Sequence, residues 1–430
     1  MIVGAAAVRL WLLAANYPLH HDEALYGYWA RLIASGRDPL LLSVWVDKPP
    51  LLMYVSAIAL RLGGGAEQIL RLPGLIASLA TVLCLHGLAR QLYGRRVALL
   101  ASVFLAGAPF AVLFAPTIFT DPWLTLWLVA AAWAAVAGRP FGAGIAFGLA
   151  VASKQQGVLA APLATALVVA GAAAGVGRPP RAAGSVAAAL GRFGLALAGL
   201  ALVFLPVTYW DSLRWSNRPS FWDRSLTTYG GLGLAPFALW PDRASAWGRI
   251  VSYLFGAPAP TAAILGLAGL AWLRDRRRFA STVIFLFCAG YLALHFCVTF
   301  QPWDRYLLPL LPFICLAAAR GVEVLWQGPL HPRPADRWRP IARAGLIAGL
   351  AAILLWGVWL GAGARLPVGS DHGAYAGLDR VAAFLAAQDA DAVIYPRWLG
   401  WHFDFFLFDA PQERRWWGAG GKLADDAAPT

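Results

Sequence analysis

The segment HHDEALYGYWARLIASG, residues 20–36, lies between two apolar stretches and combines charge with helical periodicity. Its apolar residues recur at the spacing of one helical face: Leu25, Tyr28, Trp29, Leu32 and Ile33. Asp22 is expected to cap the start of this helix, and Gly36 lies just past its end. The pattern predicts an amphipathic helix lying in a membrane interface, with two acids, Asp22 and Glu23, at its start.

The composition outside this segment is that of a membrane protein. The chain has 430 residues, of which 60% are hydrophobic and 13% are charged, whereas soluble proteins carry roughly 25% charged residues. The 21 Trp and 12 Tyr fit aromatic belts at membrane interfaces. We predict an α-helical polytopic membrane protein. A window of roughly 20 residues gives about eleven spans, near 1–15, 70–89, 97–115, 121–137, 141–153, 157–175, 191–209, 250–273, 280–299, 306–325 and 342–363.

The charge distribution predicts the orientation. The net charge is +13, but the arginines fall in short loops between spans, so anionic lipids or phosphate-bearing substrates fit better than nucleic acid. Alternate loops are rich in arginine and are therefore expected to be cytoplasmic. These arginines are Arg90, Arg95, Arg96, Arg139, Arg178, Arg181, Arg192, Arg274, Arg276, Arg277, Arg278, Arg333, Arg337, Arg339 and Arg343. The remaining loops, which hold the acids discussed below, are expected to lie on the outer side.

The predicted organisation is a membrane domain, 1–363, followed by a small outer α/β domain, 364–430. Two long outer loops interrupt the first domain, at 16–69 and 210–249; the first contains a second interfacial segment, 50–62, which begins at a Pro-Pro pair. In the C-terminal part, 376–388 is expected to be a helix and 392–395 a strand.

Two smaller features complete this picture. The first span is short and contains Arg9, which leads us to expect that the true start of the chain lies upstream of Met1. The four cysteines all fall in apolar spans without metal-ligand spacing, so no disulfide is expected.

Three outer acids are candidates for chemistry. Asp22 and Glu23 could simply begin the interfacial helix, and Asp121, between Thr120 and Pro122, could simply begin a span. A capping acid is also well fixed, however, and a fixed carboxylate can take a proton from an acceptor hydroxyl. Asp121 would supply a second carboxylate that orients the acceptor. The two aspartates could also hold a divalent cation, Mg²⁺ or Mn²⁺, and this possibility stays open.

The outer cations are candidates for binding phosphate. Lys48 and Lys154 could be ordinary snorkelling side chains, but only three lysines occur among 35 basic residues, which favours a specific role. Arg305, followed by Tyr306, could pair with Asp304 at the surface or could clamp a phosphate with its planar guanidinium. Asp47 and His21 are expected in the substrate loop. The histidines share no metal-ligand spacing and are interpreted as loop or core residues.

Taken together, these motifs resemble the C-type membrane glycosyltransferases, known as GT-C. The nearest resemblance is to the bacterial family 39-like group, which includes protein O-mannosyltransferases and the lipid A aminoarabinose transferase. The motifs occur in family order over about residues 9–325: Asp22-Glu23-Ala24, Asp47-Lys48-Pro49-Pro50, Arg71-Leu72-Pro73, Thr120-Asp121-Pro122, Ser153-Lys154-Gln155-Gln156-Gly157 and Trp303-Asp304-Arg305-Tyr306.

The resemblance implies a function. It implies a polyprenyl-phosphate-linked sugar donor, a lipid, glycan or protein acceptor, and transfer with inversion at the outer face of the bacterial inner membrane. Asp22 matches the essential first-loop acid of the family, and Asp121 matches the second acid. Lys48, Lys154 and Arg305 match positions near the donor phosphate.

Other classes of protein fit less well. A transporter or lipid flippase usually places ionisable groups near the bilayer midplane and contains internal repeats, neither of which is evident here. A non-enzymatic membrane scaffold would tolerate replacement of Asp22 or Lys48. An oligosaccharyl- or phosphoethanolamine-type transferase is a closer alternative.

Overall fold

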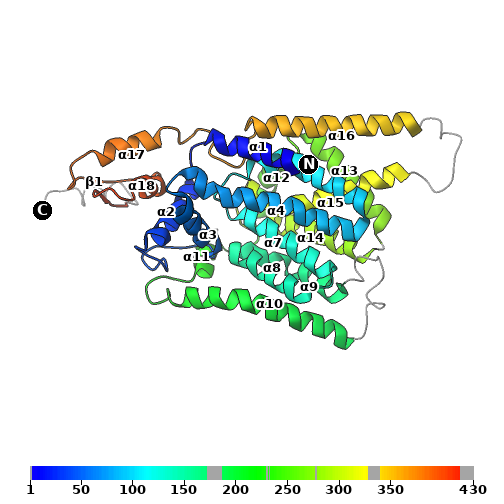
Figure 1. Ribbon diagram of the computed structural model, residues 1–430, viewed down its shortest axis with the longest axis horizontal. Coiled ribbons are helices and arrows are strands. Elements are labelled where there is room, and N and C mark those ends of the chain that lie inside the picture. Colours follow the sequence, from blue (N-terminus) through cyan, green and yellow to red (C-terminus); the bar gives the residue numbers. More distant parts are fainter. Residues whose placement is uncertain are drawn as a thin grey trace.

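The computed structural model describes residues 2–171, 186–228, 231, 233–276, 278–327 and 339–416. Nearly all of these residues that lie in regular structure are helical, and the long helices run side by side along the long axis of the molecule (Figure 1). This arrangement follows from composition, because a backbone in lipid must satisfy its own hydrogen bonds and a helix does so within one segment.

A helix occupies each of the predicted spans. These helices are α1 (Ile2–Ala15), α4 (Glu67–Tyr93), α5 (Arg95–Gly107), α7 (Asp121–Val136), α8 (Pro140–Ser153), α9 (Ala161–Ala170), α10 (Val186–Ser212), α13 (Pro258–Asp275), α14 (Phe279–Cys297), α15 (Leu311–Gln327) and α16 (Arg339–Ala362). Within the part of the chain that the structure describes, four helices are long and apolar enough to cross a membrane by themselves: α4, α10, α14 and α16. The predicted fold class is confirmed, while the number of spans stays a prediction.

Two predicted spans are each divided into two helices. The span near 97–115 is α5 followed by the short α6 (Pro109–Leu113), and the span near 250–273 is α12 (Trp240–Ser252) followed by α13. In both places a proline, Pro109 or Pro258, lies at the start of the second helix. Proline has no backbone N–H and is well suited to the first turn of a helix, where that N–H has no partner, so a new helix begins at each of these points.

The two ends of the bundle differ as the charge pattern predicts. The short helices α2 (His21–Ser35), α3 (Leu51–Gly63) and α11 (Phe221–Thr228) gather at one end, whereas α4 ends and α10 begins at the other (Figure 1). Arg95 and Arg96 therefore lie at the end opposite the outer acids. Several predicted cytoplasmic arginines lie outside the described residues: Arg178, Arg181, Arg277, Arg333 and Arg337.

The first outer helix begins two residues earlier than expected, and its cap is different. His20, not Asp22, is the N-cap: its imidazole accepts a hydrogen bond from the backbone N–H of Asp22, while Glu23 accepts one from the N–H of His20. The prediction that Asp22 caps the helix is therefore wrong. The reason is that this reciprocal pair of bonds satisfies two N–H groups at once and leaves the Asp22 carboxylate available for other contacts. Gly36 ends the helix in the left-handed conformation, as predicted.

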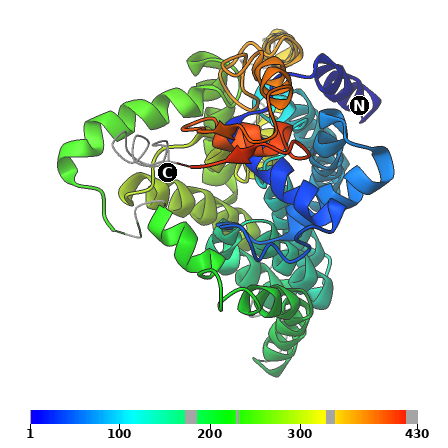
Figure 2. The same ribbon diagram turned by 90° about the vertical axis from the view of Figure 1, so that its left-hand side faces the viewer.

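The C-terminal part packs against this same end of the bundle (Figure 2). It contains α17 (Leu378–Ala386), α18 (Gly400–Phe406) and two short parallel strands, β1 (Val393–Ile394) and β2 (Glu413–Arg414). Arg31 of α2 donates to the carbonyl oxygen of Phe405 at 2.7 Å. The helix and strand predicted here are present, the division into domains at 363/364 stays a prediction, and residues 417–430 lie outside the described residues.

The second outer loop is joined to the first. Arg214 follows α10, is fully buried and donates to the carbonyl oxygens of Leu41 and Val44, each at 3.0 Å. Beyond it lie α11 and a turn of 3₁₀ helix, η4 (Phe237–Leu239). These contacts hold α11 beside the segment that carries Lys48, and so bring the two predicted outer loops to one place.

Candidate active site

A cavity of about 280 Å³ lies where the outer segments meet the bundle. Three cations contribute to its wall, together with apolar and aromatic side chains from α11, from the turn of 3₁₀ helix after α8 (Gln155–Ala160) and from the segment after α14. Its lining consists of Lys48, Lys154, Gln155, Gln156, Val158, Leu159, Trp222, Ser225, Leu226, Phe300, Arg305 and Tyr306. The predicted donor residues Lys48, Lys154, Arg305 and Tyr306 are thus brought together, although they are spread over more than half of the chain.

Each cation of the cavity pairs with a different carboxylate. Arg305 Nη1 lies 2.5 Å from Asp22 Oδ2, Lys154 Nζ lies 2.7 Å from Asp121 Oδ1, and Lys48 Nζ lies 2.5 Å from Asp47 Oδ2. The six charges balance, which explains how so many ionised groups can lie together at low exposure. The cluster unites the acids that were predicted to belong to the site, Asp22, Asp47 and Asp121, but not Glu23.

Asp22 keeps its negative charge in this cluster. Its side chain is 22% exposed, the most accessible of the three carboxylates. Burial raises the pKa of Asp22, but the nearby cations, above all Arg305, outweigh this effect and lower the pKa to about 2. A carboxylate with so low a pKa is ionised at all physiological pH values but is a weak base while the pair with Arg305 is intact.

Lys154 and Asp121 form the most buried pair, with side-chain exposures of 5% and 1%. Asp121 is the first residue of α7 and Lys154 follows the last residue of α8, so two neighbouring helix ends fix the pair. The ammonium group also lies 4.9 Å from the centre of the Tyr306 ring. Burial lowers the pKa of Lys154 to about 8, even though Asp121 favours the charged form.

Glu23 lies in a separate, fully buried cluster. Its carboxylate accepts hydrogen bonds from the side chain of Arg71, at 3.2 and 3.1 Å, and from the backbone N–H groups of His20 and Ile118, each at 3.0 Å. Arg71 in turn donates to the carbonyl oxygens of Tyr17 and Pro18. Glu23 therefore joins α2, α4 and the segment that leads into α7, and it lies outside the charged cavity.

A glycine allows this junction to close. Gly74 of α4 lies so near the segment before α7 that an added Cβ would be 2.3 Å from the carbonyl oxygen of Thr117. A side chain at this position would push the segment away from α4. The position of Asp121, four residues after Thr117, depends on this contact.

The two other predicted loop residues have different surroundings. Asp47 belongs to the charged cluster, and its carbonyl oxygen accepts a hydrogen bond from Gln155 Nε2 at 2.6 Å. His21 instead faces the C-terminal helix α18: its ring centre lies 5.8 Å from that of His402. Burial in that contact lowers the pKa of His21 to about 4.

Sequence reasoning did not identify the layer of amides behind the cations. Gln156 Nε2 lies 3.0 Å from Nε2 of His295, whose Nδ1 lies 2.8 Å from the carbonyl oxygen of Tyr291. Since a carbonyl only accepts, Nδ1 of His295 carries the proton and Nε2 accepts from Gln156. The Oε1 atoms of Gln155 and Gln156 are buried and accept no hydrogen bond from the described residues. In the sequence, both amides could have been identified as candidate site residues because they directly follow Lys154.

The donor set favours cationic side chains rather than a metal. Asp22 and Asp121 each bond a cationic side chain directly, and the described residues contain no group of three or more His, Cys, Asp or Glu suited to holding a metal ion. A divalent cation between these acids would need the ion pairs to open and further ligands to arrive.

Comparisons with known proteins show which folds this chain resembles. Residues 47–210 match the family described as dolichyl-phosphate-mannose-protein mannosyltransferase. The structure is similar to that of ArnT from Cupriavidus metallidurans in the apo state, with a TM-score of 0.70 and 16% identity over 99% of this chain and 87% of that chain. The structure of the same protein bound to undecaprenyl phosphate gives a TM-score of 0.69, again with 16% identity over 99% of this chain and 87% of that chain.

An archaeal enzyme shares the fold more distantly. The oligosaccharyltransferase of Archaeoglobus fulgidus, tethered with an acceptor peptide, has a TM-score of 0.59 and 13% identity over 96% of this chain and 63% of its own. No curated protein sequence matches the chain significantly. The family match and the shared fold support a glycosyltransferase. The chain has the fold of the C-type membrane glycosyltransferases, and its resemblance to the group that includes protein O-mannosyltransferases and ArnT is confirmed.

Proposed function

We propose that this protein transfers a sugar from a polyprenyl-phosphate donor to an acceptor hydroxyl or amine, with inversion at the anomeric carbon. The proposed site of transfer is the periplasmic face of the bacterial inner membrane. One observation carries the proposal: three cations and an apolar wall share a single cavity, and each cation pairs with a carboxylate. Transfer from a lipid-linked sugar phosphate needs cations for the phosphate, an apolar wall for the lipid and a carboxylate that can act as the base.

The cavity divides naturally between the parts of such a donor. The phosphate would lie against Lys48, Lys154 and Arg305, which supply charge-assisted hydrogen bonds. The first isoprene units would lie against Trp222, Leu226 and Phe300. ArnT, which shares this fold, has been crystallised with undecaprenyl phosphate.

Donor binding would also activate the base. The phosphate and Asp22 compete for the same guanidinium, because Arg305 both lines the cavity and bonds Asp22. As Arg305 turns toward the phosphate, the main influence that keeps the pKa of Asp22 low weakens, and the carboxylate becomes a stronger base. The acid would therefore become reactive only when the donor is in place.

The proposed step balances in the following way. The acceptor oxygen or nitrogen attacks the anomeric carbon from the side opposite the phosphate, and its proton passes to Asp22. The bond between the anomeric carbon and the phosphate oxygen breaks, and polyprenyl phosphate leaves with the electron pair. The three cations stabilise the negative charge that develops on this oxygen, so no acid is needed to protonate it. Asp121 holds Lys154 in position and orients the acceptor.

The amides behind the cations would contact the sugar. Gln155 Nε2 is held by Asp47 and Gln156 Nε2 by His295, so both Oε1 atoms are left as acceptors. A buried acceptor without a partner costs about 1–3 kcal/mol. Sugar hydroxyl groups close to the phosphate are donors that would satisfy them after a small side-chain movement.

The test is transfer of label from radiolabelled polyprenyl-phosphate sugars by the purified protein in lipid. We expect Asp22→Asn to lower the rate by about 10²–10⁴ because it removes the base. Asp409→Asn is the matched control, because Asp409 is also paired with an arginine but its side chain is 78% exposed. Undiminished transfer by Asp22→Asn would refute the assignment of the base. If the wild-type protein neither binds nor turns over any donor, the proposed function is wrong, and a transporter or flippase becomes the better interpretation.

A further inference from the structure

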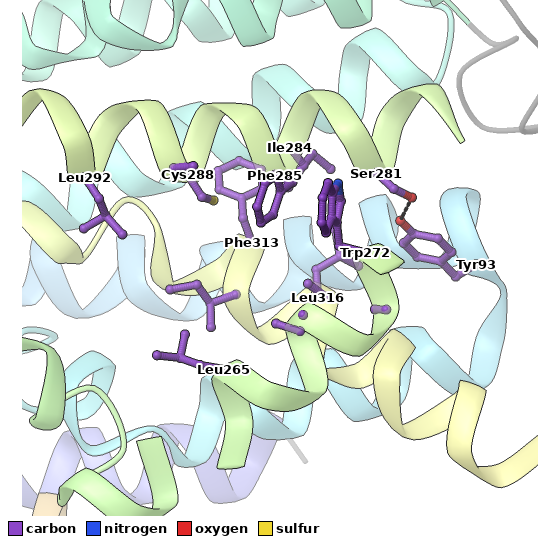
Figure 3. Close-up of a pocket in the computed structure, with 16 residues that line it drawn as sticks. Tyr93, Leu265, Trp272, Ser281, Ile284, Phe285, Cys288, Leu292, Phe313 and Leu316 are labelled. Atoms are coloured by element: carbon purple, nitrogen blue, oxygen red, sulfur yellow. Dashed lines mark hydrogen bonds between the residues drawn. The ribbon is translucent and has the colours of Figure 1, made fainter. Parts of the chain in front are cut away.

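A second cavity, of about 260 Å³, lies between α13, α14 and α15. Figure 3 shows that its wall is almost entirely apolar and that the rings of Trp272 and Phe285 lie side by side in it. These two rings stack with their centres 4.2 Å apart. Dry, apolar cavities of this kind favour apolar ligands over water.

This cavity is separate from the active site. Ser281 borders it near the start of α14, whereas His295, behind the amides of the active site, lies near the end of the same helix. The lining on this helix runs from Ser281 to Leu292, so the end of the cavity at Ser281 lies about 21 Å along the helix from His295, whereas its other end comes within about one turn. The two cavities have no lining residue in common.

Two polar side chains line one end of the second cavity, and two arginines lie close to them. Tyr93 and Ser281 line it and share a hydrogen bond of 2.7 Å (Figure 3). The guanidinium groups of Arg278 and Arg320 lie 5.9 and 5.5 Å from the centre of the Tyr93 ring.

The positive charge at this end is only partly neutralised. Asp275 makes two hydrogen bonds to Arg320, at 2.6 and 3.1 Å, but lies 3.6 Å from Arg278, whose side chain is 43% exposed. The exposed Arg274 and Arg276 lie on either side of Asp275 in the chain. The other nearby acid, Glu323, lies 4.0 Å from Arg96.

We infer that this second cavity binds one acyl chain of an anionic phospholipid, with the headgroup phosphate held by Arg278. An apolar cavity that ends in a cluster of arginines matches the two halves of such a lipid. The sequence places this end of the bundle on the cytoplasmic side, where arginine-rich loops meet anionic lipid. The inference concerns a different site from the proposed sugar transfer and does not depend on it.

Two glycines of α13 allow a matched test. A Cβ added at either Gly269 or Gly266 would have no atom within 4 Å, so both positions have space for a side chain. Gly269 lines the cavity, whereas Gly266, three residues earlier, does not. Gly269→Leu should therefore fill the cavity, and Gly266→Leu should change the helix to a similar extent while leaving the cavity empty.

The experiment is native mass spectrometry of the full chain released from nanodiscs that contain equal parts of phosphatidylglycerol and phosphatidylcholine. We expect the wild-type protein and Gly266→Leu to retain one phosphatidylglycerol. Each buried methylene group strengthens lipid binding about fourfold, so displacement of two or three by Gly269→Leu predicts retention weakened by about 15- to 60-fold. Arg278→Gln should remove the preference for phosphatidylglycerol over phosphatidylcholine, with the melting temperature of each variant as the control for folding.

Three outcomes would overturn the inference. The first is equal retention of phosphatidylglycerol by Gly269→Leu and Gly266→Leu. The second is equal retention of both phospholipids by the wild-type protein. The third is displacement of the retained phospholipid by added polyprenyl phosphate, which would assign the cavity to the donor chain.

Discussion

The activity of the transfer reaction should fall at alkaline pH as Lys154 loses its proton, which gives the pH profile an alkaline limb. Its ammonium group is proposed to hold the donor phosphate, and burial lowers its pKa to about 8. With this pKa, roughly nine-tenths of the protein carries charged Lys154 at pH 7 and roughly one-tenth does so at pH 9. The charged form binds phosphate and predominates below the pKa, so activity is lost as the pH rises. We expect kcat/KM to fall by about tenfold between pH 7 and pH 9.

The assay is kcat/KM for transfer of label between pH 6 and pH 10, because this ratio reports the pKa values of the donor-free protein. Lys154→Arg should remove the limb, since arginine stays charged throughout this range, although the planar guanidinium should lower the activity at every pH. Lys48→Arg is the matched control and should keep the limb. A flat wild-type profile, or a limb that persists in Lys154→Arg, would refute the assignment of Lys154.

Three further predictions follow from neighbouring contacts. Asp121→Asn should shift the alkaline limb to lower pH, because Asp121 favours the charged form of Lys154; an unchanged limb in the same assay would contradict this coupling. Glu23→Ala should destabilise the fold by about 3–5 kcal/mol, because it leaves Arg71 buried without its partner; melting in nanodiscs would show it, and a wild-type melting temperature would disprove it. Gly74→Ala should lower both transfer and melting temperature by displacing the segment before Asp121. If both values match wild type, the contact with Thr117 has no such role.

Local patterns were sufficient for most of the helices. Apolar stretches of membrane-spanning length must be helical, because lipid offers no partners for the backbone. The interfacial helix at 21–35 was predicted from its apolar periodicity and from the glycine after its end. The short helix at 51–63 was predicted from the paired prolines before it. Prolines occupy the starts of the helices after the breaks at Pro109 and Pro258, but Pro73 and Pro206 lie inside α4 and α10, so proline alone does not predict a break.

The N-cap of α2 could not be predicted from local sequence patterns. His20 and Asp22 can both accept from the N–H groups at a helix start, and sequence preference favours aspartate. Asp22 is drawn instead to Arg305, which lies 283 residues further along the chain. Local helix propensities take no account of a partner so far along the chain.

The sequence by itself determined the kind of residues at the site, and the tertiary structure decided their partners. Acids and scarce lysines at outer span ends indicated a charged site that binds phosphate, because charge is retained near a membrane only where it is paired or used. Which carboxylate neutralises which cation depends on how the helix ends are arranged. Packing therefore decided that Asp22 pairs with Arg305 of the charged cavity, whereas Glu23, one residue later on the same helix, is buried in a structural junction with Arg71.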